Sequence, residues 1–227
     1  MGCSCLGALT GASLGTVQEK LKTRLDLLNG VLSGDFKVEC KLYLRTDGTQ
    51  IPVHTAKLSF LNKKPQFFTL LKNNIVQSST GMEELFERLK HKNKLFTERK
   101  TVNIEYELED FLVSVGTVSV GTSAKCLCLE IEYLPCLRLK ETTQLLKEFS
   151  SMLIPADLLW TFTCGSDEVK EEKKSHEDFG QQELTPKAGL NELPRCDFSN
   201  VNLSVEIFSI RHKAFQYIKF LQENKIF

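Results

Sequence analysis

The sequence predicts an α+β fold in which an antiparallel β-sheet curls into a barrel-like structure with three or four flanking helices. Many segments alternate apolar and polar residues with a period of two, which is typical of half-buried antiparallel strands. Few segments carry a helical period with capping signals. Helices and strands also do not alternate regularly along the chain, which argues against a doubly wound parallel sheet.

Composition limits the function classes. The chain has 227 residues, with 29 Lys and Arg balancing 29 Asp and Glu, so no global field draws it onto nucleic acid or an anionic membrane. Hydrophobic residues at 41% and charged residues at 26% are ordinary globular values. No apolar run approaches the ~20 residues of a membrane span. We therefore expect one domain over 1–227, with no direct DNA contact and no membrane association.

Helix and turn signals organise the first third of the chain. A capping box, Thr16 with Glu19, and a stop at Gly30 predict a helix from Val17 to Asn29. The residues before it are expected to form a short strand or a connector. Period-two alternation and turn residues then predict four strands: Phe36–Leu44, Ile51–Leu61, Gln66–Leu71 and Ile75–Gln77.

The middle of the chain is the richest in strands. A second capping box at Thr80–Glu83 opens a helix that is predicted to reach Lys92. Alternation then predicts further strands and a third helix: Val102–Glu109, Phe111–Val115, Leu127–Tyr133, the helix Glu141–Leu153, and a strand at Leu158–Cys164. Gly116 interrupts the second of these strands and is expected to mark a bulge or a barrel corner.

The composition changes near the C-terminus. From Gly165 to Arg195 apolar residues are sparse, so this segment, 165–195, is predicted to be a flexible and dispensable insertion. Order is expected to return with a strand at Val201–Ile207. A last helix is predicted over His212–Glu223, and its apolar residues cover more of its circumference than one core contact requires.

Metal and nucleophile motifs have little support. Four histidines are scattered without H-x₃-H or H-E-x-x-H spacing, and no G-x-S-x-G, P-loop or dinucleotide fingerprint is present. The pairs Cys3/Cys5 and Cys126/Cys128 each share one face of an extended segment, but structural zinc sites use wider C-x₂₋₄-C pairs. We interpret these cysteines as small apolar side chains that line strands, and expect no cofactor.

Glutamates on two predicted strands are the one group with catalytic potential. Glu105 and Glu107 share a face of one strand with Glu109, and Glu130 and Glu132 share a face of another. Facing into a barrel, they would resemble the metal site of tunnel-type triphosphatases, and the alternative function is a metal-dependent phosphohydrolase. The opposite faces are apolar, and burying several carboxylates without cations is costly. The pattern therefore favours a solvated outer face for all five.

The segment from Asp110 to Cys136 resembles the central hairpin of the Mediator complex subunit 20 family. The resemblance lies in three runs: DFLVSVGTV (110–118), GTSAK (121–125) and EIEYLPC (130–136). It extends more weakly to the first helix, to the strand Phe36–Leu44 and to the last helix.

This resemblance implies a nuclear, non-catalytic subunit of the Mediator head module, with a barrel-like sheet flanked by helices. It implies a direct barrel-to-barrel contact with Mediator subunit 18, beside the C-terminal helix of subunit 8. Contacts with the rest of the head module, and indirectly with RNA polymerase II, would follow.

A partner surface is expected on the strands Phe111–Val120 and Lys125–Tyr133 or on the last helix, because an open barrel leaves a pairing edge. Tyr217 and Phe220 lie off the main apolar stripe of that helix and are the candidate interface residues. A carrier of a small apolar ligand is a further alternative, and would require an open interior rather than one filled by large side chains.

Overall fold

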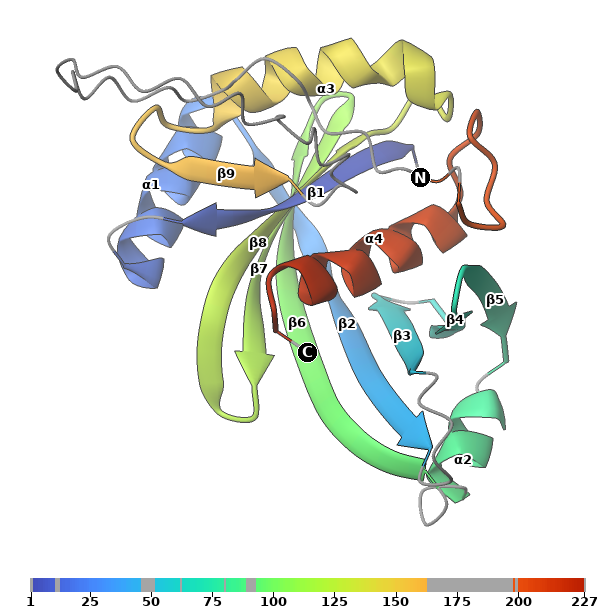
Figure 1. Cartoon of the computed structure of the whole chain (residues 1–227). Helices are drawn as coiled ribbons and strands as arrows, with labels where there is room; N and C mark the ends of the chain where they lie inside the picture. Colours follow the sequence, from blue (N-terminus) through green and yellow to red (C-terminus); the bar gives the residue numbers. More distant parts are fainter. Residues whose placement is uncertain are drawn as a thin grey trace, which may run out of the picture.

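A single curved sheet of nine strands dominates the structure, a computed structural model that describes residues 2–10, 13–45, 52–61, 63–79, 81–88, 93–162, 198 and 200–226. The strand order is β5-β4-β3-β2-β6-β7-β8-β1-β9, and all neighbours are antiparallel. Within the described residues the two edge strands do not pair, so the sheet curls without closing (Figure 1). The α+β class with an antiparallel, barrel-like sheet is confirmed.

Thirteen elements follow one another in the described residues. In the first half they are β1 (Cys3–Thr10), α1 (Leu14–Leu27), β2 (Val31–Arg45), β3 (Val53–Phe60), β4 (Gln66–Leu71), β5 (Asn74–Ser78) and α2 (Gly81–Arg88). In the second half they are β6 (Asn93–Leu108), β7 (Phe111–Val120), β8 (Ser123–Tyr133), α3 (Leu139–Leu153), β9 (Leu159–Phe162) and α4 (Ile210–Glu223). The predicted insertion at 165–195 lies outside the described residues.

Helix α1 begins earlier than its capping box predicts. Its N-cap is Ser13, whose hydroxyl accepts a hydrogen bond from the backbone N–H of Thr16 at 3.2 Å. Thr16 is therefore inside the helix. The residues before α1 form β1, a strand flanked by β8 and β9, rather than a connector.

The strand predicted at Val201–Ile207 is wrong. Ser204 Oγ accepts hydrogen bonds from the N–H groups of Glu206 and Ile207, which turns the chain and removes donors that a strand would need. One isolated bridge, Arg138 with Ile207, is the antiparallel pairing found in this segment.

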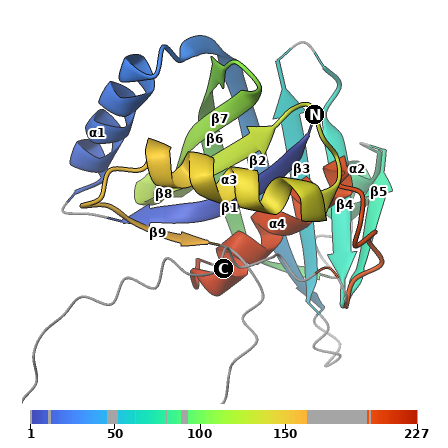
Figure 2. The ribbon, with the colours of Figure 1, turned by 90° about the horizontal axis from the view of Figure 1, so that it is seen from above.

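Helices cover both faces of the sheet (Figure 2). Helix α4 lies across the concave face, and contacts β1, β2, β3, β4 and β5, whereas α1 and α3 pack against the opposite side of β1 and β8. Alternate residues of β1 accordingly enter two cores: Leu6 and Ala8 face α4, whereas Cys3 and Leu9 face α1 and α3. Strands β1 and β8 are thus buried on both faces.

Gly116 does not interrupt β7, so the bulge predicted there is wrong. It pairs in register with Asn103 of β6, and the irregularity of β7 lies between Val118 and Ser119. A Cβ at Gly116 would lie 1.7 Å from Oδ1 of Asn103. The glycine therefore makes room for the side chain of Asn103 on the concave face.

Candidate functional site: the polar cluster beneath helix α4

Helix α4 is fixed at its N-terminus by a capping box that uses histidine. The Ser209 N–H donates to His212 Nδ1 at 3.0 Å, and His212 Nε2 lies 2.8 Å from the carbonyl oxygen of Ser204. A neutral imidazole satisfies both contacts, with the proton on Nε2. The ring also packs between Phe198 and Phe208. Burial lowers the pKa of His212, although its backbone partners oppose the shift.

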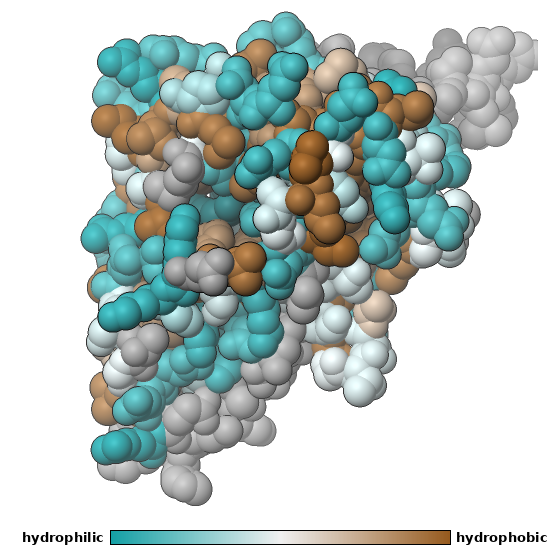
Figure 3. Space-filling view, turned by 180° about the vertical axis from the view of Figure 1, so that it is seen from behind, coloured by the Kyte–Doolittle hydropathy of each residue, from teal (hydrophilic) through white to brown (hydrophobic). Residues whose placement is uncertain are grey.

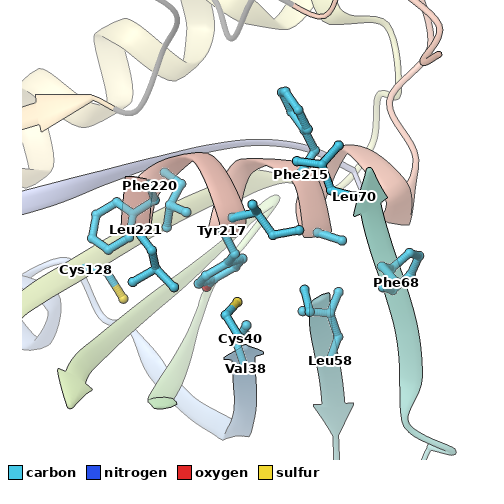
Figure 4. Close-up of a cluster of buried hydrophobic side chains, with 14 of the residues drawn as sticks. Val38, Cys40, Leu58, Phe68, Leu70, Cys128, Phe215, Tyr217, Phe220 and Leu221 are labelled. Atoms are coloured by element: carbon cyan, nitrogen blue, oxygen red, sulfur yellow. The ribbon is translucent and has the colours of Figure 1, made fainter. Parts of the chain in front are cut away.

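Most of the circumference of α4 is buried inside the chain. Figure 4 shows Tyr217, Phe220 and Leu221 pointing from the helix toward the sheet. Tyr217 is 1% exposed and Phe220 0% exposed, so the prediction that these two residues form a partner interface is wrong. The physical reason is the curvature of the sheet, which covers a wider arc of the helix than a flat sheet could.

A buried lysine joins α4 to two glutamates of β8. The Nζ of Lys213 donates to Oε2 of Glu132 at 2.9 Å and lies 3.0 Å from Oε1 of Glu130, although the second contact lacks the alignment of a hydrogen bond. The side chain of Lys213 is 3% exposed. Nζ also lies 4.9 Å from the ring centroid of Phe36, within cation–π range.

The charges in this cluster constrain one another. Burial lowers the pKa of Lys213, but Glu130 and Glu132 outweigh burial and leave it above its ordinary value. Burial raises the pKa of Glu132, but Lys213 and the Gly2 N–H outweigh burial and leave it lowered. For Glu130, burial prevails over Lys213 and the pKa is raised. Lys213 and Glu132 therefore form a charged pair at neutral pH, and Glu130 is the weaker acid.

Hydrogen bonds extend the cluster in both directions. The hydroxyl of Tyr217 donates to Glu130 Oε2 at 3.0 Å and accepts from Asn103 Nδ2 at 3.4 Å. The backbone N–H of Gly2 donates to Glu132. Gln216 links α4 to β1, because its Nε2 donates to the carbonyl oxygen of Ser4 at 2.9 Å. The polar groups of α4 are thus paired with β1, β6 and β8 at defined positions.

The solvated outer face predicted for the glutamates is wrong for Glu130 and Glu132. Helices α1 and α3 cover the other face of β8, so neither face of that strand is free. Burial of the two carboxylates is possible because Lys213 supplies a cation beside them. Glu107 and Glu109 are exposed, as predicted, and Glu105 is half-buried, accepting from Ser114 Oγ at 3.4 Å.

The arrangement offers little to the phosphohydrolase alternative. No group of three or more His, Cys, Asp and Glu side chains in the described part of the chain could hold a metal ion. The space in front of Glu130 and Glu132 is filled by Lys213 and by the large side chains of α4. The same filling leaves no open interior there for an apolar ligand. The cluster instead holds helix α4 against the sheet.

The strand edge that was predicted to pair with a partner is also placed differently. Strands β7 and β8 lie inside the sheet, because β6 pairs with β7 and β1 pairs with β8. Exposed apolar side chains lie instead at other sites, and Figure 3 shows some of them as brown groups among hydrophilic ones. They include two sets. Leu27, Val31 and Leu32 are close together in the chain, whereas Leu137, Val205 and Ile207 lie on two segments that are joined by the bridge between Arg138 and Ile207.

The cysteines line strands, as interpreted from the sequence. Cys3 and Cys5 lie in β1, Cys126 and Cys128 in β8, and each pair packs into one of the two cores. Burial raises the pKa of all four thiols, that of Cys126 to about 11. None of the helices in the described part of the chain is long and apolar enough to cross a membrane.

Comparisons with known proteins agree on a family. The family model described as the TATA-binding related factor of subunit 20 of the Mediator complex matches residues 3–222. The Mediator of RNA polymerase II transcription subunit 20 of Gallus gallus is 31% identical over 162 residues, which cover 66% of this chain and 75% of the relative. The Homo sapiens protein of that name is 32% identical over 165 residues, covering 66% of this chain and 76% of the relative.

Solved structures resemble the chain more distantly. A chain in the structure of the Schizosaccharomyces pombe Mediator head module aligns with 56% of this chain and 79% of its own length, at 13% identity and a TM-score of 0.31. The PH1012 protein from Pyrococcus horikoshii aligns with 68% of this chain and 94% of its own length, at 17% identity and a TM-score of 0.39. The family model, in contrast, matches nearly the whole chain, and by this match the chain belongs to the Mediator subunit 20 family.

Proposed function

We propose that this protein is a non-catalytic subunit of the Mediator coactivator complex, a head-module scaffold that relays regulatory signals to RNA polymerase II. The observation that carries the proposal is the family match over residues 3–222. The relatives that match the chain are named for Mediator and RNA polymerase II transcription. A nuclear location follows from that role.

The interior of the fold supports a scaffold rather than an enzyme. Helix α4 fills the concave face, and two of the four glutamates that were candidates for catalysis, Glu130 and Glu132, are paired with Lys213. A chain with no net charge has no global electrostatic attraction to DNA. Its contribution to transcription is then through protein contacts.

The proposed direct partner is Mediator subunit 18, through its related barrel, beside the C-terminal helix of subunit 8. The contact surface is not formed by Tyr217 and Phe220, which are buried. Exposed apolar side chains are what a protein interface requires, and the two sets defined above supply them.

Affinity purification of the tagged chain from nuclear extract, followed by mass spectrometry, tests the function. Subunits of the head module should copurify in near-equal amounts, and subunit 18 should remain bound in the highest salt. Recovery without any Mediator subunit would contradict the proposal.

Co-expression with subunit 18 tests the partner separately. The wild-type pair should copurify. Two double variants test the two apolar sets: Val31→Glu with Leu32→Glu, and Val205→Glu with Ile207→Glu. One of them should weaken copurification, and the other should leave it unchanged. Circular dichroism of each variant alone should be unchanged. If the wild-type chain does not bind subunit 18 but still copurifies with the head module, the proposed function is supported and this direct partner is excluded.

A further inference from the structure

Helix α4 reaches its site from a distant part of the chain. It follows β9 in the sequence, and the 35 residues 163–197 separate Phe162 of that strand from Phe198, whose side chain belongs to the same core as α4 and packs against His212 and Phe215. The contacts of α4 with the sheet are noncovalent, and they reach β1 to β5 as well as β6 and β8. The segment therefore contacts the sheet in the way that a bound peptide contacts its receptor.

We propose that the concave face of the sheet is a helix-binding groove, that the C-terminal segment 198–226 is its ligand, and that the groove accepts this segment as a separate peptide. The recognised class is an amphipathic helix that carries a lysine, followed four residues later by a tyrosine, on its buried side. The proposal does not depend on membership of the Mediator complex.

Apolar contacts supply the binding energy. The ligand side contributes large side chains that are at most 5% exposed, namely Phe198, Phe215, Tyr217, Ile218, Phe220 and Leu221. The groove side is equally well buried and comes from four strands, with Val38 and Cys40 from β2, Leu58 from β3, Phe68 and Leu70 from β4 and Cys128 from β8 (Figure 4). Several of these ligand residues recur at three- and four-residue spacing, the pattern of helix-in-groove recognition.

Polar contacts supply the register. A slide of the helix by one turn moves it by about 5.4 Å along its axis. Lys213 would then leave Glu130 and Glu132, and the buried carboxylates would have no cation within the groove. The hydroxyl of Tyr217 and the amide of Gln216 would lose Glu130 and Ser4 in the same step. Because an unpaired buried charge is costly, one register is strongly preferred.

The experiment uses the whole chain. A recognition sequence for a site-specific protease is inserted after Gly180, the C-terminus is labelled with a fluorophore, and the folded chain is cleaved. The two halves should stay together on a sizing column. An excess of unlabelled synthetic peptide of residues 198–227 should then replace the labelled half, with urea raised in steps until exchange is complete, and fluorescence anisotropy should fall.

Two matched variants of the competing peptide test the recognition chemistry. Lys213→Met removes the cation but keeps the length of the side chain, and should raise the concentration needed for half-exchange by about a hundredfold or more. Arg211→Met removes an exposed cation two residues away, and should change it by less than about threefold.

Three outcomes would overturn the proposal. The halves of the cleaved wild-type chain could separate on the column at micromolar concentration. The wild-type peptide could fail to replace the labelled half at any urea concentration below that which unfolds the cleaved chain. The Lys213→Met peptide could compete as well as the Arg211→Met peptide. Each of these results would show that the groove does not recognise the segment as a ligand.

Discussion

Lys213 of α4 donates to Glu132 of β8 at 2.9 Å, and both side chains are less than 5% exposed. The two residues are 81 positions apart in the sequence. A buried ion pair adds less to stability than its Coulomb energy indicates, because both charges lose water. Removal of one member nevertheless leaves the other charge buried and unpaired. The pair therefore allows one register between the helix and the sheet.

Glu132→Ala should therefore destabilise the protein strongly. The change leaves the Lys213 ammonium without its aligned carboxylate and the Gly2 N–H without its acceptor. We expect a loss of about 3–5 kcal/mol in the free energy of unfolding, measured by urea denaturation. Glu107→Ala, at an exposed position, is the control and should change it by less than about 0.5 kcal/mol. Equal effects of the two changes would contradict a structural role for the pair.

Gly116→Ala should destabilise through a clash with Asn103. The added Cβ would lie 1.7 Å from Asn103 Oδ1, so the amide must move away from Tyr217. The expected cost is about 1–3 kcal/mol in the same urea assay. Adding Asn103→Ala should cost less in the Gly116→Ala background than in the wild type, because the clash is removed.

Gly15→Ala is the matched control for that substitution. Its Cβ would meet nothing within 4 Å, and the residue lies in the first turn of α1. The change should stabilise the protein by about 0.4–1 kcal/mol, since alanine has less freedom in the unfolded chain. Destabilisation at both positions would show that the cost is not specific to the site of Asn103.

Arg24→Ala should loosen the contact between α1 and α3. The guanidinium of Arg24 donates from Nε at 3.0 Å and from Nη2 at 2.9 Å to the carbonyl oxygen of Met152, in the last turn of α3. Hydrogen exchange of the amides in the last turn of α3 should speed up severalfold. Arg24→Lys should recover little, because an ammonium lacks the planar fork. Lys22→Ala, exposed on the same helix, should leave the exchange unchanged.

Local patterns in the sequence were sufficient for most of the elements. Strand β4 begins and ends at the predicted residues, Gln66 and Leu71, because turn signals bound it on both sides. Helix α3 ends at Leu153 as predicted, where Pro155 follows closely. These features depend on neighbours in the chain, and one sequence contains that information.

The facing of Glu130 and Glu132, and the burial of Tyr217 and Phe220, depend on how α4 docks. Periodicity shows that a strand has two different faces, but not that both are covered. The available signal was Lys213, a lysine on the same helical face as Tyr217, four residues apart. A cation inside an apolar stripe requires a buried anion, and the strand with Glu130 and Glu132 provides one.

Acidification should destabilise the protein through His54. Burial, with a further contribution from Lys219, lowers the pKa of His54 from 6.5 to about 4. The unfolded chain therefore binds a proton at this residue between pH 6.5 and 4, whereas the folded chain does not. The stability contributed by neutral His54 is fully present above pH 6.5 and is lost as the pH falls through the folded pKa.

His54→Gln isolates this effect, because glutamine does not titrate and can still meet Gln222, which lies 3.0 Å from His54 Nε2. The free energy of unfolding of both proteins should be measured from pH 7 to pH 4.5. Wild type should lose about 1–2 kcal/mol more than the variant. The difference between the two proteins removes the contributions of His212 and Glu130, which both proteins share. The lowered pKa of His212 acts on stability in the same direction as that of His54, and the raised pKa of Glu130 acts in the opposite direction. Parallel curves for the two proteins would show that His54 carries no proton-linked stability.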